Sequence, residues 1–262
     1  MRAFAIGLAA LLAACGNSSP QDLTSGQWID LSHTFDEQTL YWPTADKFAI
    51  ETVSEGVTEG GYYYSAYNIK TAEHGGTHLD APIHFAEGAF ATDEIPLDDL
   101  IGPGAIIDVS ARAEGNRDYL ITPADVRDWE EANGRLPDGA IVLFNTGSAR
   151  FWPDAAAYMG TERRGPEAVK ELHFPGIHPD TAELLANQRK VGAVGIDTPS
   201  IDYGQSTDFM AHRVLFAANI PAFENVANLD QLPATGATIV ALPMKIRGGS
   251  GGPLRIVAHL PE

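Results

Sequence analysis

The sequence predicts a single domain of the mixed α/β class, and three observations support this. The chain has 262 residues, of which 44% are hydrophobic, and this suits one large globular core. Predicted strands outnumber predicted helices along the chain. In the second half, strands and helices alternate, which is typical of α/β proteins. We find no internal repeat and no long low-complexity linker in the sequence that would divide the chain.

Three strands are predicted in the first part of the chain, at residues 28–32, 48–53 and 62–71. The third segment alternates aromatic and polar residues, as half-buried strands do. Its tyrosines are Tyr62, Tyr63, Tyr64 and Tyr67. Two interpretations stay open: these are ordinary half-buried strand residues, or they line an aromatic pocket.

Later elements are predicted from short apolar runs and from helix-end signals. Thr122 and Pro123 mark the start of one helix as its cap and first turn, and Gly134 marks its end. Two further helices are predicted at residues 179–190 and 209–218. The predicted strands are residues 104–109, 139–145, 191–196, 238–244 and 255–260.

The segment from Glu73 to Phe85 holds the most informative pattern. Four ligating side chains stand at even positions, namely His74, His78, Asp80 and His84. In an extended backbone, side chains alternate between two faces, so all four would point to one side. Neutral imidazole and carboxylate groups are ligands for Zn or Mn, and also for Fe, Ni or Co. Three of the eight histidines of the chain fall in this segment, so a metal site is favoured over a chance cluster.

Gly75, Gly76 and Pro82 disfavour a helix over the same segment and favour an extended one. His84 follows His78 by six residues, which is about 20 Å along a straight strand. The segment must therefore bend if His84 is to reach the same metal ion. Pro82 is the expected place for that bend.

His212 and Glu224 form a second candidate pair, although their spacing alone does not distinguish a site from structural residues. Polar residues after predicted strands are weaker candidates, because such positions either line sites or form turns. They are Asn145–Thr146–Gly147, Asp197, Asp202 and Asp208, and Asp197 is the strongest of them because it directly follows a buried strand. The remaining histidines are expected to be structural or surface residues: His33, His173, His178 and His259.

The N-terminal residues predict export. Residues 1–14 have the pattern of a signal peptide, with Arg2 as its positive start and an apolar run too short to span a bilayer. The run ends in Leu-Ala-Ala-Cys-Gly, which resembles a bacterial lipobox with Cys15 as the lipidated residue. The alternative is ordinary cleavage that discards Cys15, the only cysteine. Residues 15–26 are expected to be a tether and residues 27–262 the folded domain, exposed on the periplasmic or extracellular side of a membrane.

Composition argues against several other functions. The formal net charge is −18 and no Lys/Arg-rich run offsets it, so nucleic acid is not an expected partner, and a membrane is expected only through the lipid anchor. Gly147-Ser148-Ala149 does not supply the Gly-x-Ser-x-Gly nucleophile elbow of a serine hydrolase. Residues 248–252 are rich in glycine but lack the Lys-Ser/Thr of a phosphate loop, so we expect a turn, at the rim of the site or simply in a hairpin.

The pattern His-x-Gly-Thr-His-x-Asp-x-Pro-x-His at residues 74–84 resembles the signature of the metal-dependent cyclase family. The matching positions are His74, Gly76, Thr77, His78, Asp80, Pro82 and His84. This family includes bacterial kynurenine formamidases and isatin hydrolases. His212, the pair Glu224–Asn225 and residues 228–233 continue the resemblance, which covers nearly all of the chain from Trp28 onward. It implies the swivelling β/β/α fold.

The resemblance implies a metal ion held by His74, His78 and Asp80. His84 then acts as a general acid or base, or it binds a second ion with His212 and Glu224 while Asp80 bridges the two. Kynurenine formamidases suggest two ions, whereas isatin hydrolases suggest one, of Mn. We expect one tightly bound Mn or Zn ion with His84 as proton carrier. His212 and Glu224 would orient His84 or hold a weaker second ion.

The implied reaction is hydrolysis of a C–N amide bond in a small aromatic molecule by metal-activated water. Two substrate types follow from the resemblance, a cyclic amide such as isatin and an aryl formamide such as N-formylkynurenine. The export signal disfavours a role in cytoplasmic tryptophan breakdown, so we favour the cyclic amide. A non-catalytic metal-binding lipoprotein is the competing class, and metal-dependent amide turnover would decide against it. We also expect a homodimer or a higher homo-oligomer.

Overall fold

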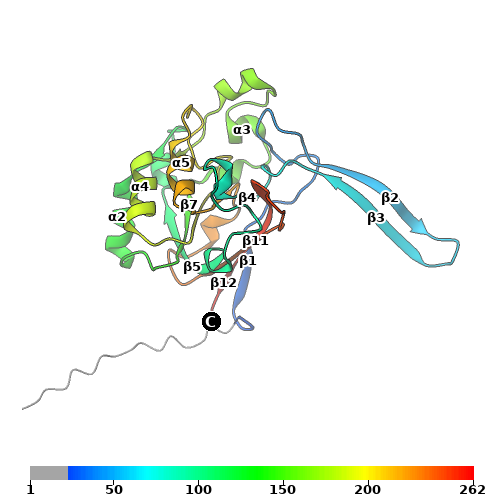
Figure 1. Cartoon of the computed structure of the whole chain (residues 1–262), viewed down its shortest axis with the longest axis horizontal. Coiled ribbons are helices and arrows are strands. Elements are labelled where there is room, and N and C mark those ends of the chain that lie inside the picture. Colours follow the sequence, from blue (N-terminus) through cyan, green and yellow to red (C-terminus); the bar gives the residue numbers. More distant parts are fainter. Residues whose placement is uncertain (1–22) are drawn as a thin grey trace, which may run out of the picture.

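The computed structural model describes residues 23–262 (Figure 1). The predicted signal peptide at residues 1–14 and the predicted lipidation site at Cys15 lie outside the described residues, as does most of the predicted tether at residues 15–26. Within the described part, no helix combines the length and the hydrophobicity that a bilayer crossing requires.

An eight-stranded sheet forms the body of the molecule. Seven of its strands close into a barrel-like ring, because β4 pairs with β10 on one side and with β12 on the other. The remaining strand, β1, pairs with β12 alone. In sheet order, the strands are β1 (Gln27–Asp30), β12 (Gly251–Leu260), β11 (Thr238–Pro243), β5 (Ile101–Asp108), β7 (Ile141–Asn145), β9 (Ala193–Ile196), β10 (Ala222–Glu224) and β4 (His78–Asp80).

The parallel strands β5, β7, β9 and β10 run through the middle of the molecule. Along β7, Val142 and Phe144 point to a core under the helices, whereas Ile141 and Leu143 point into the closed sheet. All four side chains are completely buried. Burial on both faces explains why the parallel strands form continuous apolar runs in the sequence.

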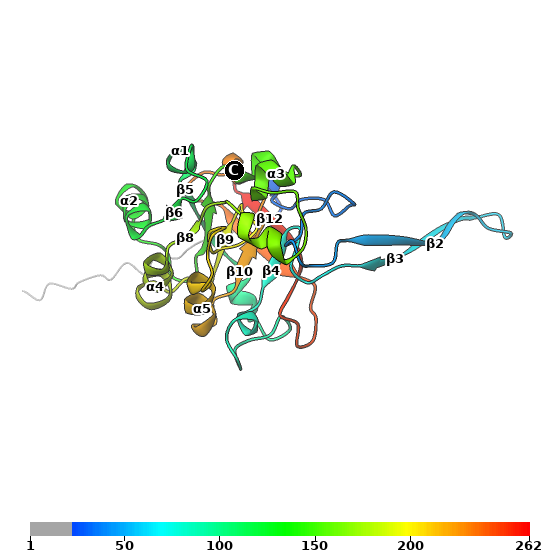
Figure 2. The ribbon, with the colours of Figure 1, turned by 90° about the horizontal axis from the view of Figure 1, so that it is seen from above.

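Helices cover the outer face of the parallel strands (Figures 1 and 2). A capping box between Thr122 and Asp125 starts α2 (Pro123–Asn133), and Gly134 ends it in a conformation with φ of 88°. α4 (Pro179–Gln188) and α5 (Met210–Ala217) contact each other on the same face. Shorter elements are α1 (Ser110–Ala113), α3 (Ala155–Met159), the paired strands β6 (Leu120–Ile121) and β8 (Gly176–Ile177), and the 3-10 turns η1 (Pro82–His84), η2 (Leu97–Asp99), η3 (Ser148–Phe151), η4 (Pro166–Glu171) and η5 (Leu229–Gln231).

Two further strands, β2 (Ala49–Val57) and β3 (Tyr63–Lys70), form an antiparallel hairpin that projects from the body (Figures 1 and 2). We call residues 49–70 the arm. Both strands pair only with each other. The tyrosines left open by the sequence lie on this arm, are 44–63% exposed and do not line the cavities of the described residues, so the pocket-lining interpretation is wrong: Tyr62, Tyr63, Tyr64 and Tyr67.

The predicted mixed α/β domain is confirmed, and every predicted strand and helix occurs with ends that differ by a few residues. The segment around the metal motif differs from the prediction of one extended stretch. Only β4 is extended; Gly76 precedes it with φ of 58°, and η1 follows it. Pro82 opens η1, so the expected bend is confirmed at the expected residue.

Candidate metal centre

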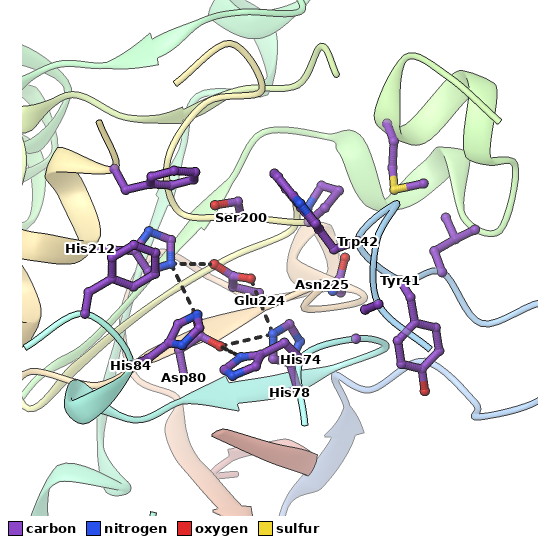
Figure 3. A pocket seen from close by; sticks show the side chains of 17 residues that line it. Tyr41, Trp42, His74, His78, Asp80, His84, Ser200, His212, Glu224 and Asn225 are labelled. Atoms are coloured by element: carbon purple, nitrogen blue, oxygen red, sulfur yellow. Dashed lines mark hydrogen bonds and ion pairs between the residues drawn. The ribbon is translucent and has the colours of Figure 1, made fainter. Parts of the chain in front are cut away.

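A cavity of about 300 Å³ opens beside β4 (Figure 3). Its apolar lining includes Leu40, Tyr41, Trp42, Phe85, Met159 and Phe209. The candidate site residues from both parts of the sequence also line it: His74, His78, Asp80, His84, His212 and Glu224. The fold thus brings together side chains that lie up to 150 residues apart in the sequence.

Two of the ligating side chains come from the three residues of β4. Glu224 of β10 lies opposite His78 on one side, and Gly251 of β12 lies opposite Asp80 on the other. Because side chains alternate along a strand, His78 and Asp80 face the cavity, while Leu79 faces the core and is completely buried. Pairing on both sides fixes the backbone under these two ligands.

His74 reaches the centre from the turn before β4. Gly76 has φ of 58°, a conformation that glycine adopts without strain. His74 Nδ1 lies 2.6 Å from Asp80 Oδ1, and His74 Nε2 lies 2.9 Å from Ser250 Oγ. Ser250 Oγ donates in turn to Glu73 at 2.7 Å, so it must accept from His74. Nε2 of His74 therefore carries a proton, and Nδ1 faces Asp80 Oδ1, where a metal ion could take the place of a shared proton.

Asp80 lies between two sets of ligating atoms (Figure 3). Its Oδ1 is 3.1 Å from His78 Nε2, and its Oδ2 is 3.2 Å from His212 Nε2. Glu224 approaches the same two nitrogens, at 3.4 Å from His78 and 3.3 Å from His212. Two groups have metal-binding geometry: His74, His78 and Asp80, and Asp80, His212 and Glu224. Asp80 belongs to both groups and is placed to bridge them.

Neighbouring groups orient the ligands that come from the second half of the chain. Asp202 Oδ2 lies 2.6 Å from His212 Nδ1, so the proton of His212 points away from the cavity and Nε2 points into it. Asp202 also accepts from the backbone N–H of Ala211 at 3.0 Å, at the start of α5. Glu224 Oε1 accepts from the backbone N–H of Ile201 at 2.8 Å.

The backbone and two buried side chains orient His78. Its Nδ1 donates to the carbonyl oxygen of Gly76 at 2.9 Å, which leaves Nε2 for a ligand. Asn225 Nδ2 donates to the same carbonyl at 2.7 Å, and the Tyr158 hydroxyl donates to Asn225 Oδ1 at 2.9 Å. This chain of hydrogen bonds holds the tautomer and the direction of the ring.

The charged groups of the centre shift one another's pKa values strongly. Burial works to lower the pKa of His78, but Asp80 and Glu224 outweigh it and raise the pKa to about 10. Burial likewise opposes the charge on His212, yet hydrogen bonds to carboxylates hold its pKa well above the ordinary value. Burial works to raise the pKa of Asp80, and the surrounding histidines hold it well below its usual range. Buried carboxylates thus require positive charge at this place, from protons or from a cation.

The residues present fit a divalent metal ion. His78 Nε2 is buried and has no hydrogen-bond partner, although two carboxylates stand within ion-pair distance. Imidazole nitrogens and carboxylate oxygens that converge on one point suit Zn or Mn. An ion would satisfy the orphaned nitrogen and balance the buried negative charge.

His84 belongs to neither metal-binding group. The η1 turn stacks its ring on that of His74, with 3.9 Å between centroids and 20° between planes. The centroid of His212 is 6.2 Å away. Burial lowers the pKa of His84 to about 4, so the imidazole is neutral at pH 7 and can accept a proton. This geometry favours proton transfer over ligation of a second ion.

Other polar residues noted at strand ends have local structural contacts. Asp197 is completely buried and accepts hydrogen bonds from the backbone N–H groups of Thr146 and Ser148, both at 2.8 Å. Asn145 Oδ1 accepts from the backbone of Gly147 at 3.1 Å. Asp202 is therefore the aspartate of this region that contacts the centre, and Asp197 is not.

No signal in the sequence singles out three residues that contribute to the centre, and only Asp202 is among the weaker candidates there. Asp202 stands in a turn with other aspartates, Ser250 lies in a glycine-rich hairpin, and Tyr158 lies in a short helix. Each reaches the centre only through contacts distant in sequence. The predicted turn at residues 248–252 is confirmed as the hairpin between β11 and β12, and Ser250 brings it to the rim of the site.

The chain is similar to one family model and to several known hydrolases. A family model described as "Putative cyclase" matches residues 29–203. Isatin hydrolase of Roseibium aggregatum is 33% identical over 225 residues, which are 82% of this chain and 82% of that protein. Kynurenine formamidase of Salinibacter ruber is 32% identical over 229 residues, which are 87% of this chain and 95% of that protein. The solved structure of isatin hydrolase A from Ralstonia solanacearum matches with a TM-score of 0.81 and 34% identity, over 89% of this chain and 92% of that one.

Proposed function

The chain belongs to the putative cyclase family, and we propose that it is a hydrolase that opens a small aromatic cyclic amide of the isatin type. It is a metal-dependent enzyme acting on C–N amide bonds, as the names of its relatives and the ligating side chains of the centre indicate. The proposed substrate rests on one observation, namely that the ligating side chains of the metal centre line a cavity with aromatic walls. Asp80 links two sets of ligating side chains in a cavity with aromatic lining, which suits a flat ring with a reactive carbonyl.

We propose one tightly bound Mn or Zn ion, held by His74, His78 and Asp80. The Nδ1 of His74, which faces Asp80, and the unpartnered Nε2 of His78 support this set. His212 and Glu224 would hold a weaker second ion or orient the groups around the first. A bound ion supplies Lewis acidity toward the amide carbonyl and lowers the pKa of a water molecule.

The side chains of the cavity position the reactants and move the protons. Tyr41, Trp42 and Phe85 form an apolar lining that would hold the aromatic ring and exclude bulk water. Hydrolysis removes a proton from the attacking water and delivers one to the leaving nitrogen. His84 is neutral at pH 7 and stacked on His74, so it would take the first proton and return it as the C–N bond breaks. The product is a carboxylate with a free aromatic amine.

Metal content and amide hydrolysis should be measured on the same purified protein. Full-length protein loaded with Mn²⁺ or with Zn²⁺ would be assayed by absorbance on isatin, N-formylkynurenine and formanilides. We expect isatin turnover that stops when a chelator removes the metal and returns when the metal is restored. Metal binding without turnover of any amide would overturn the proposal.

His84→Ala separates proton transfer from metal ligation. As a proton carrier, His84 should leave the metal content unchanged when removed, lower activity by roughly 10²- to 10⁴-fold and eliminate one limb of the pH–rate profile. His212→Ala and Glu224→Ala are the comparison variants. If the wild type binds two ions and all three variants bind one, His84 is a metal ligand and not the proton carrier.

Arylformamidase activity is the second candidate. The group Asp80, His212 and Glu224 supports it, because two further ligands and the shared Asp80 would allow a second ion beside the first. The 32% identity to a kynurenine formamidase supports it as well. Turnover of N-formylkynurenine faster than isatin would select this function over the first.

Two finer proposals accompany the function. The closed sheet with helices on its outer face supports assignment of the fold to the swivelling β/β/α type.

The apolar run and Cys15 in the sequence support export and anchoring by a lipid. Wild-type protein should then partition into detergent with the membrane fraction, and Cys15→Ala should not. Soluble, unlipidated wild-type protein would contradict the anchor.

A further inference from the structure

Phe209 lines the cavity and has a backbone conformation that is unfavourable for an aromatic residue. Its φ is 52°, which lies in the left-handed region. The other non-glycine residues of the described chain with positive φ are all asparagine, which tolerates this conformation best: Asn219, Asn225 and Asn228. A strained backbone persists only where the surrounding structure enforces it, and residues of this kind cluster at functional sites.

Phe209 also occupies an unusual place in the fold, the N-cap of α5. An N-cap residue is normally Ser, Thr, Asp or Asn in an extended conformation, and its side chain accepts hydrogen bonds from the first N–H groups of the helix. In α5 these bonds go to Asp202, which accepts from the backbone N–H of Ala211 at 3.0 Å and of His212 at 3.2 Å. Because another part of the chain caps the helix, the N-cap position is available to an aromatic side chain.

Hydrogen bonds on both sides fix the backbone of Phe209. Its N–H donates to Ser206 Oγ at 3.1 Å, and its carbonyl accepts from the N–H of Arg213 at 3.0 Å. Ser206 Oγ lies 3.5 Å from Asp202 Oδ1, so this turn is held by the same carboxylate that orients His212. The surroundings therefore determine the strained conformation.

The ring of Phe209 lies at the cavity and not in the core. Its centroid is 5.3 Å from that of Phe85 and 6.3 Å from that of His212. Phe85 also packs against the core under the helices, whereas Phe209 packs against none of the hydrophobic clusters in the described part of the chain. Since core packing does not account for the strained backbone, the position of the ring at the cavity is its evident consequence.

We propose that Phe209 is a specificity-determining residue, whose ring forms one wall of the substrate site and admits only flat rings without bulk on that side. This inference rests on the proposed function, because it concerns the aromatic amide that the cavity would hold. Figure 3 shows Tyr41 and Trp42 on the side of the cavity away from His212, and Phe209 lies next to His212. A substrate ring between the two sides would therefore meet aromatic side chains on both.

Phe209→Ala tests the wall by steady-state kinetics of the metal-loaded enzyme. The substrates are isatin and the isatins that carry one methyl group at each position of the benzene ring in turn. We expect the KM for isatin to rise about 10-fold with a smaller change in kcat and unchanged metal content, because the ring contributes binding and not chemistry. At least one methylisatin should gain about 10-fold or more in kcat/KM relative to isatin.

Phe151→Ala is the matched control for loss of an aromatic ring. Phe151 is 39% exposed and does not line the cavity, so its removal should leave the order of substrates as in the wild type. An unchanged order of substrates in Phe209→Ala, or the same change in both variants, overturns the proposal.

Binding of indole separates this proposal from the proposed function. Indole is flat, bicyclic and uncharged, but it has no amide bond to hydrolyse. Calorimetry on the metal-loaded proteins should show indole binding that weakens about 10-fold in Phe209→Ala, with at least one methylindole gaining relative to indole. If this pattern occurs in a protein that hydrolyses no amide, the proposed function fails and the role of Phe209 is supported. No binding of indole to the wild type, or equal affinity in both proteins, overturns the role of Phe209.

Phe209→Gly tests the strain itself. Glycine adopts a φ of 52° freely and alanine does not, so Phe209→Gly should unfold at a higher urea concentration than Phe209→Ala. Arg213 is an exposed residue within α5, where glycine is less favourable than alanine. Arg213→Gly should therefore unfold at a lower urea concentration than Arg213→Ala. The same order at both positions would overturn the strain on which the proposal depends.

Discussion

Asn225 Nδ2 donates to the carbonyl of Gly76, which also accepts from His78. Asn225→Ala removes this donor and leaves the Tyr158 hydroxyl without its acceptor side chain. Because the direction of His78 Nε2 then loosens, we expect metal affinity to fall about 10- to 100-fold. Calorimetric titration of the metal-free protein with Mn²⁺ measures this change.

Asn228→Ala is the matched control. Asn228 shares the positive φ of Asn225, at 55° against 53°, and its side chain also donates to a backbone carbonyl, that of Asp30. It does not line the cavity. Its loss should leave metal affinity unchanged, and an equal fall in both variants would contradict the role of Asn225.

His33 provides a pH effect that does not depend on the metal. Its ring stacks on Trp152 with 4.1 Å between centroids, and burial lowers its pKa to about 4. The unfolded chain, with a histidine pKa of about 6.5, therefore binds more protons between pH 6.5 and 4. The free energy of unfolding that neutral His33 contributes is fully present above pH 6.5 and is lost as the pH falls through this window. The loss is at most about 3 kcal/mol.

Urea unfolding of metal-free wild type and His33→Gln at pH 7 and pH 4.5 measures the His33 effect. The variant should lose less free energy of unfolding than the wild type on acidification. The other titrating groups are common to both proteins, so the difference isolates His33. Identical losses would show that His33 does not titrate in this window.

At the scale of elements, the sequence predicts those helices and strands whose signals lie within or beside the element itself. The cap at Thr122, Pro123 and Gly134 lies within or beside α2, and the apolar run of β7 reflects burial on both faces. In contrast, β4 and β10 have three residues each, and their strand character comes from partners distant in the chain. No window along the sequence contains those partners.

The same limit applies to the centre. Alternate spacing brings His78 and Asp80 together, as predicted. His74 joins them through a glycine turn rather than through a continuous strand, and His84 joins through a 3-10 turn. The sequence therefore indicates a set of residues that the fold brings together, but not the backbone that assembles them. Asp202 is only one of several weaker candidates in the sequence, because only folding places it beside His212.

Gly76→Ala tests the glycine turn. An added Cβ would meet the Phe35 ring at 2.6 Å, and the φ of 58° is unfavourable for alanine. We expect a loss of about 2–4 kcal/mol in the free energy of unfolding, from backbone strain and displacement of the ring. Metal affinity should fall too, since the Gly76 carbonyl holds His78.

Gly88→Ala separates the two contributions to the Gly76 effect. Gly88 has φ of 78°, and a Cβ there would meet nothing within 4 Å. Urea unfolding should show a loss of about 1–2 kcal/mol from the backbone conformation alone, with metal binding unchanged. Equal costs for the two variants would contradict the steric role of Phe35.

For the whole molecule, the sequence predicts the class of fold but not the closure of its sheet. Strand and helix content follow from local patterns, and they are confirmed. Closure depends on β4, which joins the two ends of the ring by pairing with β10 and β12. The arm is likewise predicted as two strands, whereas its separation from the body follows from the absence of other strand partners.

Because β4 is paired on both sides, its amide hydrogens cannot exchange with solvent unless the ring opens. Deuterium uptake at residues 78–80 should therefore be among the slowest in the chain and should approach the rate set by global unfolding. The metal has a different route, since His74 lies outside the ring with its side chain 25% exposed. A chelator should thus withdraw the ion many times faster than deuterium enters β4. The metal-free β4 should keep its conformation and bind a new ion without refolding. Deuterium uptake at residues 78–80 as fast as metal loss would contradict the rigidity of β4.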